Sequence, residues 1–243
     1  MSRDSNYDHH ISIFSPNGRL YQVEYAFKGA TSSLTSVAIR GADSVCVVTQ
    51  KKVPERLIDP TSVTNIYEIT PKIGAVMTGM SPDSKAMVSR IRYEANQFEY
   101  NYGYTMPVHV LAKRIADLNQ LRTQQSGLRI LACTTLLVAV DDEKGPTVMK
   151  VDPAGHFAPY KAAAAGNKEQ EAVNYFEKRV GEFGTNSTDD TIRTAIMCLG
   201  SVLGSDFRGS EVEVASLTGK GKFGKLTEDE IESHLNAIAE MDA

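Results

Sequence analysis

Two hydrophobic periods, one typical of strands and one typical of helices, alternate in a definite order along the chain. Short β-rich runs come first, separated by turn signals such as Gly41-Ala42-Asp43; they lie at 35–39, 45–49, 64–69 and 73–78. Two amphipathic helical patterns then follow in direct succession, with apolar residues at every third or fourth position. The first opens at Ser81, which we expect to be the N-cap before Pro82, and the second opens at Pro107.

The second half of the chain repeats this order. A nearly continuous apolar run at 130–140 predicts a strand buried on both faces, and 147–152 is its expected partner. Short strands follow as far as Ala165. After them we expect two helices, at 173–180 and 192–203, then a strand at 212–217 and a last helix at 231–238. Thr227-x-x-Glu230 is a capping box that opens the last helix. The pattern therefore predicts an α/β (α+β) fold, a four-layer αββα sandwich with two sheets face to face and a helical layer outside each.

A turn and a helix precede the sandwich. Ser15-Pro16-Asn17-Gly18 has the composition of a tight turn, and a helix is expected from Arg19 to Ala30. Five aromatic residues fall in this short N-terminal part: Tyr7, Phe14, Tyr21, Tyr25 and Phe27. They could be buried against a partner subunit or against the parent domain, and composition favours neither alternative.

Charge and cysteine usage exclude several classes of protein. The net charge of −4 argues against nucleic acid or an anionic membrane as the partner. We expect no secretory signal, because the N-terminus is polar with no apolar stretch after it, and no window approaches the ~18 apolar residues of a membrane span. Cys46, Cys133 and Cys198 each lie in an apolar run, which predicts core residues in a reducing compartment.

No motif in the sequence predicts a catalytic or metal site. The segment Gly219–Leu226 resembles a P-loop, but Leu226 stands where a magnesium-binding Ser or Thr is required, and a Gly/Lys hairpin is the better interpretation. His9 and His10 lack a second pair of metal ligands, so we expect them at the surface or at an interface. His109 and His234 are expected on solvated helix faces. We expect no cofactor.

A resemblance to a known family begins at Tyr7. The residues that carry it are Tyr7-Asp8, Ser12-Ile13-Phe14-Ser15-Pro16-Asn17-Gly18-Arg19 and Gln22-Val23-Glu24-Tyr25-Ala26, which together resemble the N-terminal signature of proteasome alpha subunits. Further agreement lies at Gln50–Pro54, Met77–Met80, Asp152–Gly155 and Thr194–Leu199. The segment Tyr25–Lys28, with 49–54, looks most like the alpha-6 type, also called alpha-1 by ring position.

The resemblance implies a sandwich like that of the N-terminal nucleophile hydrolases, with an extra N-terminal helix and one domain over 1–243. It divides the chain into a gate segment (1–14), a turn and helix (15–31) and the sandwich (34–243). It also implies a seven-membered alpha ring stacked on a catalytic beta ring. Leu34, Gln50 and Asn65 stand where the beta subunits carry their nucleophile, acid and lysine, so we expect a non-catalytic subunit.

The remaining roles implied by the resemblance are gating and docking. A gate cluster would consist of Tyr7, Asp8, His9, Pro16 and Tyr25, with Asp8 accepting a hydrogen bond from a tyrosine of the neighbouring subunit. Pockets between alpha subunits would receive the tails of activators at Gly18, Asn65 and Gly79. The expected partners are other alpha subunits, beta subunits and activator particles, in cytoplasm and nucleus, for ubiquitin-dependent and ubiquitin-independent degradation.

Two residues depart from the family pattern. His9 replaces an arginine, so a titratable ring stands in place of a permanent cation. Asn65 replaces the pocket lysine and brings no charge, which predicts weak binding of activator tails there. Two alternative functions follow from other features: a hydrolase released by cleavage before Thr35, and a nucleotide-binding regulator that uses Gly219–Lys225.

Overall fold

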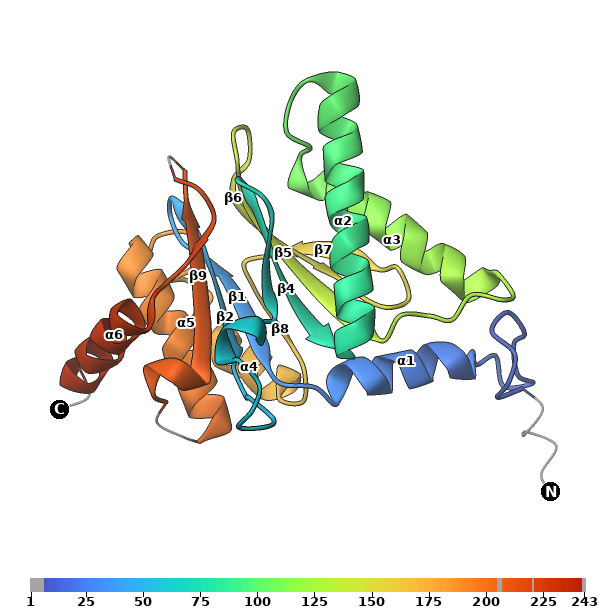
Figure 1. Cartoon of the computed structure of the whole chain (residues 1–243), viewed down its shortest axis with the longest axis horizontal. Coiled ribbons are helices and arrows are strands. Elements are labelled where there is room, and N and C mark those ends of the chain that lie inside the picture. The colour runs from blue at the N-terminus through green and yellow to red at the C-terminus, as the bar shows by residue number, and fades with distance from the viewer. Residues whose placement is uncertain (1–6, 205–206, 220, 242–243) are drawn as a thin grey trace.

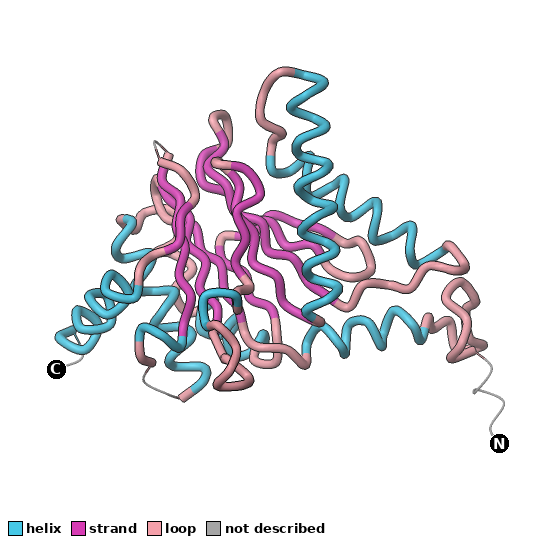
Figure 2. Tube along the Cα trace, in the orientation of Figure 1, coloured by secondary structure: helices cyan, strands magenta, loops and turns pink. Residues whose placement is uncertain are grey.

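The computed structural model describes residues 7–204, 207–219 and 221–241. They form two five-stranded antiparallel sheets that lie face to face, with helices on both outer sides (Figures 1 and 2). In spatial order the first sheet contains β10 (Gly224–Lys225), β9 (Val212–Thr218), β2 (Ser44–Gln50), β1 (Ser36–Arg40) and β8 (Ala162–Ala165). The second contains β3 (Ile66–Thr70), β4 (Ile73–Gly79), β5 (Cys133–Asp141), β6 (Gly145–Val151) and β7 (Phe157–Tyr160).

The two sheets are built differently from the sequence. The second sheet joins strands that are consecutive in the chain, and β5 at its centre pairs with both β4 and β6. The first sheet joins early and late strands, because β1 pairs with β8 and β2 pairs with β9. The first sheet therefore closes only when strands from both halves of the chain are present.

Helices cover both outer faces. The second sheet is covered by α2 (Ser81–Tyr102) and α3 (Val108–Gln124), and the first by α4 (Glu169–Glu177), α5 (Thr188–Leu203) and α6 (Glu228–Met241). Two short 3-10 turns, η2 (Pro60–Ser62) and η3 (Gly209–Glu211), complete the elements. Separate apolar clusters fill the three interfaces between layers, around Ile91, Leu136 and Leu199. This arrangement confirms the predicted αββα sandwich.

The extra N-terminal helix, α1 (Tyr21–Thr31), lies outside the two helical layers, beside the ends of β4 and β5 (Figure 1). Its two buried residues are small: Ala26 joins Ile130 and Ala132 in a minor cluster, and Ala30 is the other. Gly29 allows the close approach, because a methyl group at its position would lie 3.0 Å from the Ala132 methyl. The helix therefore touches the sandwich along a narrow line and leaves most of its surface uncovered.

Several predicted boundaries need correction. Ser81 is the first helical residue rather than the N-cap; Met80 is the cap, and its carbonyl accepts a hydrogen bond from the Ser84 N–H. The apolar run from Ile130 becomes a strand only at Cys133, because Ile130 and Ala132 instead contact α1. Three other elements also differ from prediction: β3 begins at Ile66, α4 ends at Glu177 before the exposed Val180, and α6 extends to Met241.

The capping box at the start of α6 is confirmed. The Glu230 carboxylate accepts from the Thr227 N–H at 2.7 Å, and the Thr227 hydroxyl oxygen accepts from the Glu230 N–H at 3.3 Å. These reciprocal bonds satisfy backbone donors that the first turn of a helix leaves unpaired.

The glycine- and lysine-rich segment after β9 is a hairpin and not a P-loop. The short strand β10 pairs with β9, where a P-loop would continue into a helix. Phe223 and Leu226 flank this short strand on either side. Phe223 is only 5% exposed and fills the space above Gly74, which carries no side chain. The structure therefore gives no support to a nucleotide-binding function for this segment.

The predictions for cysteines and histidines have different outcomes. All three cysteines are buried and free, as predicted. His9 and His10 are exposed, whereas His109 and His234 are partly buried rather than fully solvated, and the Nδ1 atom of His109 is buried without a partner among the described residues. Within the described ranges, no helix combines the length and apolar character that a membrane crossing requires.

Candidate functional site: the N-terminal segment and the adjoining sheet edge

The turn before α1 is held by the bonds that its sequence predicts. The Gly18 N–H donates to the Ser15 carbonyl at 2.8 Å, and the Arg19 N–H donates to the Ser15 hydroxyl at 3.0 Å. Gly18 has a φ of +74°, a conformation that residues with a Cβ rarely adopt. Pro16 and Asn17 are exposed at the tip of this turn. These bonds therefore fix the direction in which the preceding segment enters α1.

Two of the predicted gate residues contact each other within the chain. The Tyr25 hydroxyl donates to the Asp8 carboxylate at 2.6 Å, and the Gln22 amide donates to the Asp8 backbone carbonyl. Together these bonds hold residue 8 against one side of α1. Tyr7 is partly buried, and His9 and Pro16 are exposed. Among the described residues of the single chain, no side-chain hydrogen bond or ion pair joins these other three predicted members to the Asp8–Tyr25 pair.

Electrostatics strengthen this arrangement. The hydrogen bond to Asp8 is the main cause that raises the pKa of the Tyr25 phenol above its ordinary value, because ionisation would place two negative charges together. Arg19, just before α1, pairs with Glu24, and its guanidinium carbon lies 5.1 Å from the centre of the Tyr21 ring. The Arg19 hydrogen bond is also the main cause that lowers the pKa of Glu24. These hydrogen bonds and ion pairs are exposed to solvent, so each contributes little free energy.

The N-terminal aromatic residues are not used in the core. Phe14 is 64% exposed and Tyr25 is 47% exposed, while Tyr7, Tyr21 and Phe27 are partly buried. An exposed group of aromatic side chains is typical of a protein interface. Of the two alternatives left by the sequence, the structure therefore favours a partner subunit.

The predicted docking residues lie in two places. Asn65 directly precedes β3; its N–H donates to the Glu213 carboxylate at 3.0 Å, and its carbonyl accepts from the Met77 N–H at 2.9 Å. Gly79 ends β4, where its backbone packs against Ala132. Gly18 lies beyond the opposite end of α1, so one chain alone does not bring all three residues together (Figure 1).

A lysine that sequence reasoning missed lies beside Asn65. The Lys225 ammonium donates to the Thr64 hydroxyl and to the Glu213 carboxylate, the latter at 3.1 Å. Glu213 is largely buried and faces β3 from the other sheet, so it needs a cation. Alternation along β9 could have placed Glu213 on the inward face, but nothing local links β10 to β3. The positive charge absent at position 65 is thus present nearby, already paired with a carboxylate.

The positions that would carry hydrolase chemistry are occupied by structural contacts. Thr35 is fully buried, and its hydroxyl donates to the Asn167 side chain at 2.6 Å. Its backbone carbonyl accepts from the Gln50 N–H at 3.3 Å. A threonine at a new N-terminus would need a solvent-accessible hydroxyl to act as a nucleophile. These contacts argue against the alternative of a hydrolase released before Thr35.

No centre for a metal ion is assembled by the described residues: nowhere do three or more His, Cys, Asp or Glu side chains converge in a suitable arrangement. We call the group formed by Thr64, Asn65, Glu213 and Lys225 the β3 edge. Both the N-terminal region and the β3 edge are suited to recognition of a partner. They offer exposed aromatic rings, one carboxylate in reach of a tyrosine, and a paired lysine beside a neutral amide.

Comparisons with known proteins agree with the residues described above. The family model for proteasome subunits matches residues 30–217, and the model for the N-terminal signature of the alpha-type proteasome subunits matches residues 7–28. The chain is similar over its whole length to a probable proteasome subunit alpha type-1 of Schizosaccharomyces pombe, at 47% identity, and to proteasome subunit alpha type-6 of Caenorhabditis elegans, at 44%. Each of these alignments covers all of both chains.

A third relative is proteasome subunit alpha type-1 of Trypanosoma brucei brucei, at 40% identity over 98% of this chain and 92% of the relative. The signature that defines alpha-type members covers the segment that contains the turn, the Asp8–Tyr25 contact and most of α1. The chain therefore belongs to the proteasome subunit family, in its non-catalytic alpha type.

Proposed function

We propose that this chain is a structural subunit of the outer ring of the proteasome, that its N-terminal segment forms part of the entry gate, and that its β3 edge helps to dock regulatory particles. The observation that carries the proposal is the N-terminal segment itself. It matches the alpha-type signature, it lies outside the sandwich, and it exposes aromatic residues that the chain does not use in its own core.

The gating part of the proposal rests on the contact between Asp8 and Tyr25. In a ring, the Asp8 carboxylate could instead accept a hydrogen bond from a tyrosine of the neighbouring subunit, and the Tyr25 hydroxyl could donate to a carboxylate of a neighbour. Both groups are accessible for this, because they lie at the surface. The intrachain bond would then compete with the interchain bond that holds the gate open. His9, an exposed residue next to Asp8, brings no permanent guanidinium charge to this balance.

Two measurements on the assembled particle test this function. Electron microscopy should place the chain in a seven-membered outer ring, and any other position would refute the structural role. Deletion of residues 1–11 should raise the basal rate of fluorogenic peptide hydrolysis, because the segment before the turn no longer covers the pore. The matched control is Tyr102→Phe, an exposed tyrosine at the far end of α2. If the deletion leaves the basal rate unchanged, the gating role is wrong.

Docking is tested separately at the β3 edge. Asn65→Lys should increase the binding of activator tails and the stimulated peptidase rate, since an exposed charge pair contributes about 0.2–1 kcal/mol. Asn65→Gln is the control that retains the amide without adding charge. Equal stimulation by both variants would show that this edge does not meet the carboxylate of an activator tail.

We also propose that the particle serves ubiquitin-dependent and ubiquitin-independent degradation in cytoplasm and nucleus. The buried, unpaired thiols are compatible with the reducing conditions of these compartments. Fluorescent labelling of the chain in cells tests the location, and signal confined to any other compartment would refute it.

A further inference from the structure

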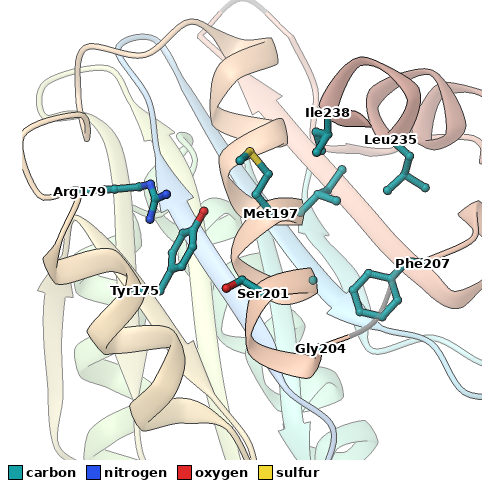
Figure 3. Close-up of a pocket in the computed structure, with 10 residues that line it drawn as sticks. Tyr175, Arg179, Met197, Ser201, Gly204, Phe207, Leu235 and Ile238 are labelled. Carbon is teal, nitrogen blue, oxygen red and sulfur yellow. The ribbon is translucent and has the colours of Figure 1, made fainter. Parts of the chain in front are cut away.

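A groove lies on the helical layer outside the first sheet, among residues of α4, α5 and α6 and the segments that follow α4 and α5 (Figure 3). Its cavity has a volume of about 500 Å³. The floor is the outward face of α5, where Met197, Ser201 and Gly204 succeed one another at helical spacing. We call this feature the α5 groove. Gly200, Ser201 and Gly204 have small side chains or none. The backbone of another element can therefore come close to α5 at the floor of the groove.

One wall of the α5 groove is apolar. It consists of Leu235 and Ile238 from α6 and Phe207 from the segment after α5 (Figure 3). All three side chains are partly exposed, and Met241, one turn beyond Ile238, is 65% exposed. Apolar surface that remains accessible in this way is stabilised when a partner removes it from water.

The opposite wall carries a cation. Arg179 follows α4, and its guanidinium lies 4.0 Å from the centre of the Tyr175 ring, which holds it at the groove (Figure 3). Among the residues that the structure describes, no carboxylate lies within ion-pair distance of Arg179. By contrast, Arg193 of α5 and Arg90 of α2 each have a carboxylate partner one turn away.

We propose that the α5 groove docks an amphipathic helix of a protein outside the core particle, with apolar side chains against Phe207, Leu235 and Ile238 and an acidic side chain against Arg179. Charge complementarity selects this occupant: a low floor and an apolar wall with a single guanidinium opposite suit an apolar stripe flanked by one carboxylate. A floor of two helical turns matches apolar residues at positions i, i+4 and i+7 of the docked helix. The inference needs only that the chain is part of an assembly and does not depend on the gate.

The test uses the assembled particle and a library of 14-residue helical peptides with one face randomised. Peptides selected on the wild-type particle should carry apolar residues at i, i+4 and i+7 together with Asp or Glu. Arg179→Glu should weaken their binding at least tenfold, and peptides with Lys in place of the acidic residue should recover binding to that variant. Lys178→Glu is the matched control, because Lys178 is an exposed cation next to Arg179 that does not line the groove.

Other outcomes overturn the proposal. Ser201→Arg places a long side chain in the groove and should abolish the binding of peptides that dock there. If every selected peptide still binds this variant, no helix docks in the groove. Selected peptides that bind the wild type and Arg179→Glu equally would refute the acidic partner. If a cysteine at Ser201→Cys resists alkylation in the intact particle, another subunit covers the groove, and docking of an outside protein is excluded.

Discussion

The contact between Phe223 and Gly74 leads to a prediction that links the C-terminal hairpin to the β3 edge. Gly74 faces the space between the sheets, and the Phe223 ring occupies the volume where a side chain would stand. A methyl group built at position 74 overlaps three atoms of that ring, well inside the ~3.5 Å of normal carbon contact. Gly74→Ala should therefore expel the ring from its site, although the backbone of Gly74 itself tolerates alanine.

The magnitudes follow from burial. Phe223→Ala removes an almost fully buried ring and should lower the free energy of unfolding by about 3–5 kcal/mol. Gly74→Ala should cost about 1–3 kcal/mol through overpacking. In the double variant the new methyl group enters space that the ring has left, so the cost should be close to that of Phe223→Ala alone. The coupling energy between the two positions should thus be about 1–3 kcal/mol.

Urea denaturation of the four proteins, followed by circular dichroism, measures this coupling. Gly181→Ala is the control, since a methyl group at that surface glycine meets no neighbouring atom and should change stability by less than about 1 kcal/mol. Additive effects of Gly74→Ala and Phe223→Ala, within about 0.5 kcal/mol, would refute the contact. Because β10 also carries Lys225, which bonds to Thr64, displacement of the Phe223 ring should also weaken the activator docking that we propose for the β3 edge.

Other consequences of the structure can be measured on the same chain. Asp83 is buried against Arg129, whose hydrogen bond is the main cause that lowers the pKa of Asp83. The contribution of Asp83 to stability is therefore present above about pH 4 and is lost as the pH falls further. Asp83→Asn should make the free energy of unfolding, measured between pH 2 and 7, fall less steeply at acid pH. The Tyr25 phenol should ionise above its ordinary pKa, and Asp8→Asn should lower that midpoint in absorbance titrations read as differences from Tyr25→Phe; an unchanged midpoint would contradict the hydrogen bond. Burial raises the pKa of Cys133 and Cys198 to about 12, so maleimide should label neither residue at pH 8 until the chain unfolds; labelling of the native chain, detected by mass spectrometry, would contradict their burial.

The parts of the fold that sequence reasoning predicted are those with local causes. Hydrophobic periods indicated the two sheets and the helical layers, and the turn at Ser15–Gly18 followed from its residues alone. The predicted end of α4 is too late because Val180 continues the apolar spacing, although the chain turns at Arg179, whose N–H donates to the Phe176 carbonyl. The residue type of Ser81 favours a cap, whereas the Met80 carbonyl already accepts the first helical bond.

What could not be predicted depends on contacts between distant segments. No local signal relates Phe223 to Gly74, or Lys225 to Thr64, because the two sheets must pack before these pairs meet. The α5 groove is likewise invisible in the sequence, since its walls belong to elements on either side of α5 (Figure 3). The proposed gate and docking residues follow from family resemblance; among the residues that the structure describes, a hydrogen bond within the chain joins Asp8 and Tyr25.

The strand order of the two sheets has a consequence for synthesis on the ribosome. The strands β3 to β7 pair only with sequence neighbours, so the second sheet can form as soon as β7 has emerged. In the first sheet, one edge of β1 and one edge of β2 remain unpaired until β8 and β9 are synthesised late in translation. We expect ribosome-bound chains that end after β7 to resist protease over β3 to β7 while β2 is still cut. Until the last strands are made, the nascent chain exposes two apolar strand edges and depends on protection from aggregation.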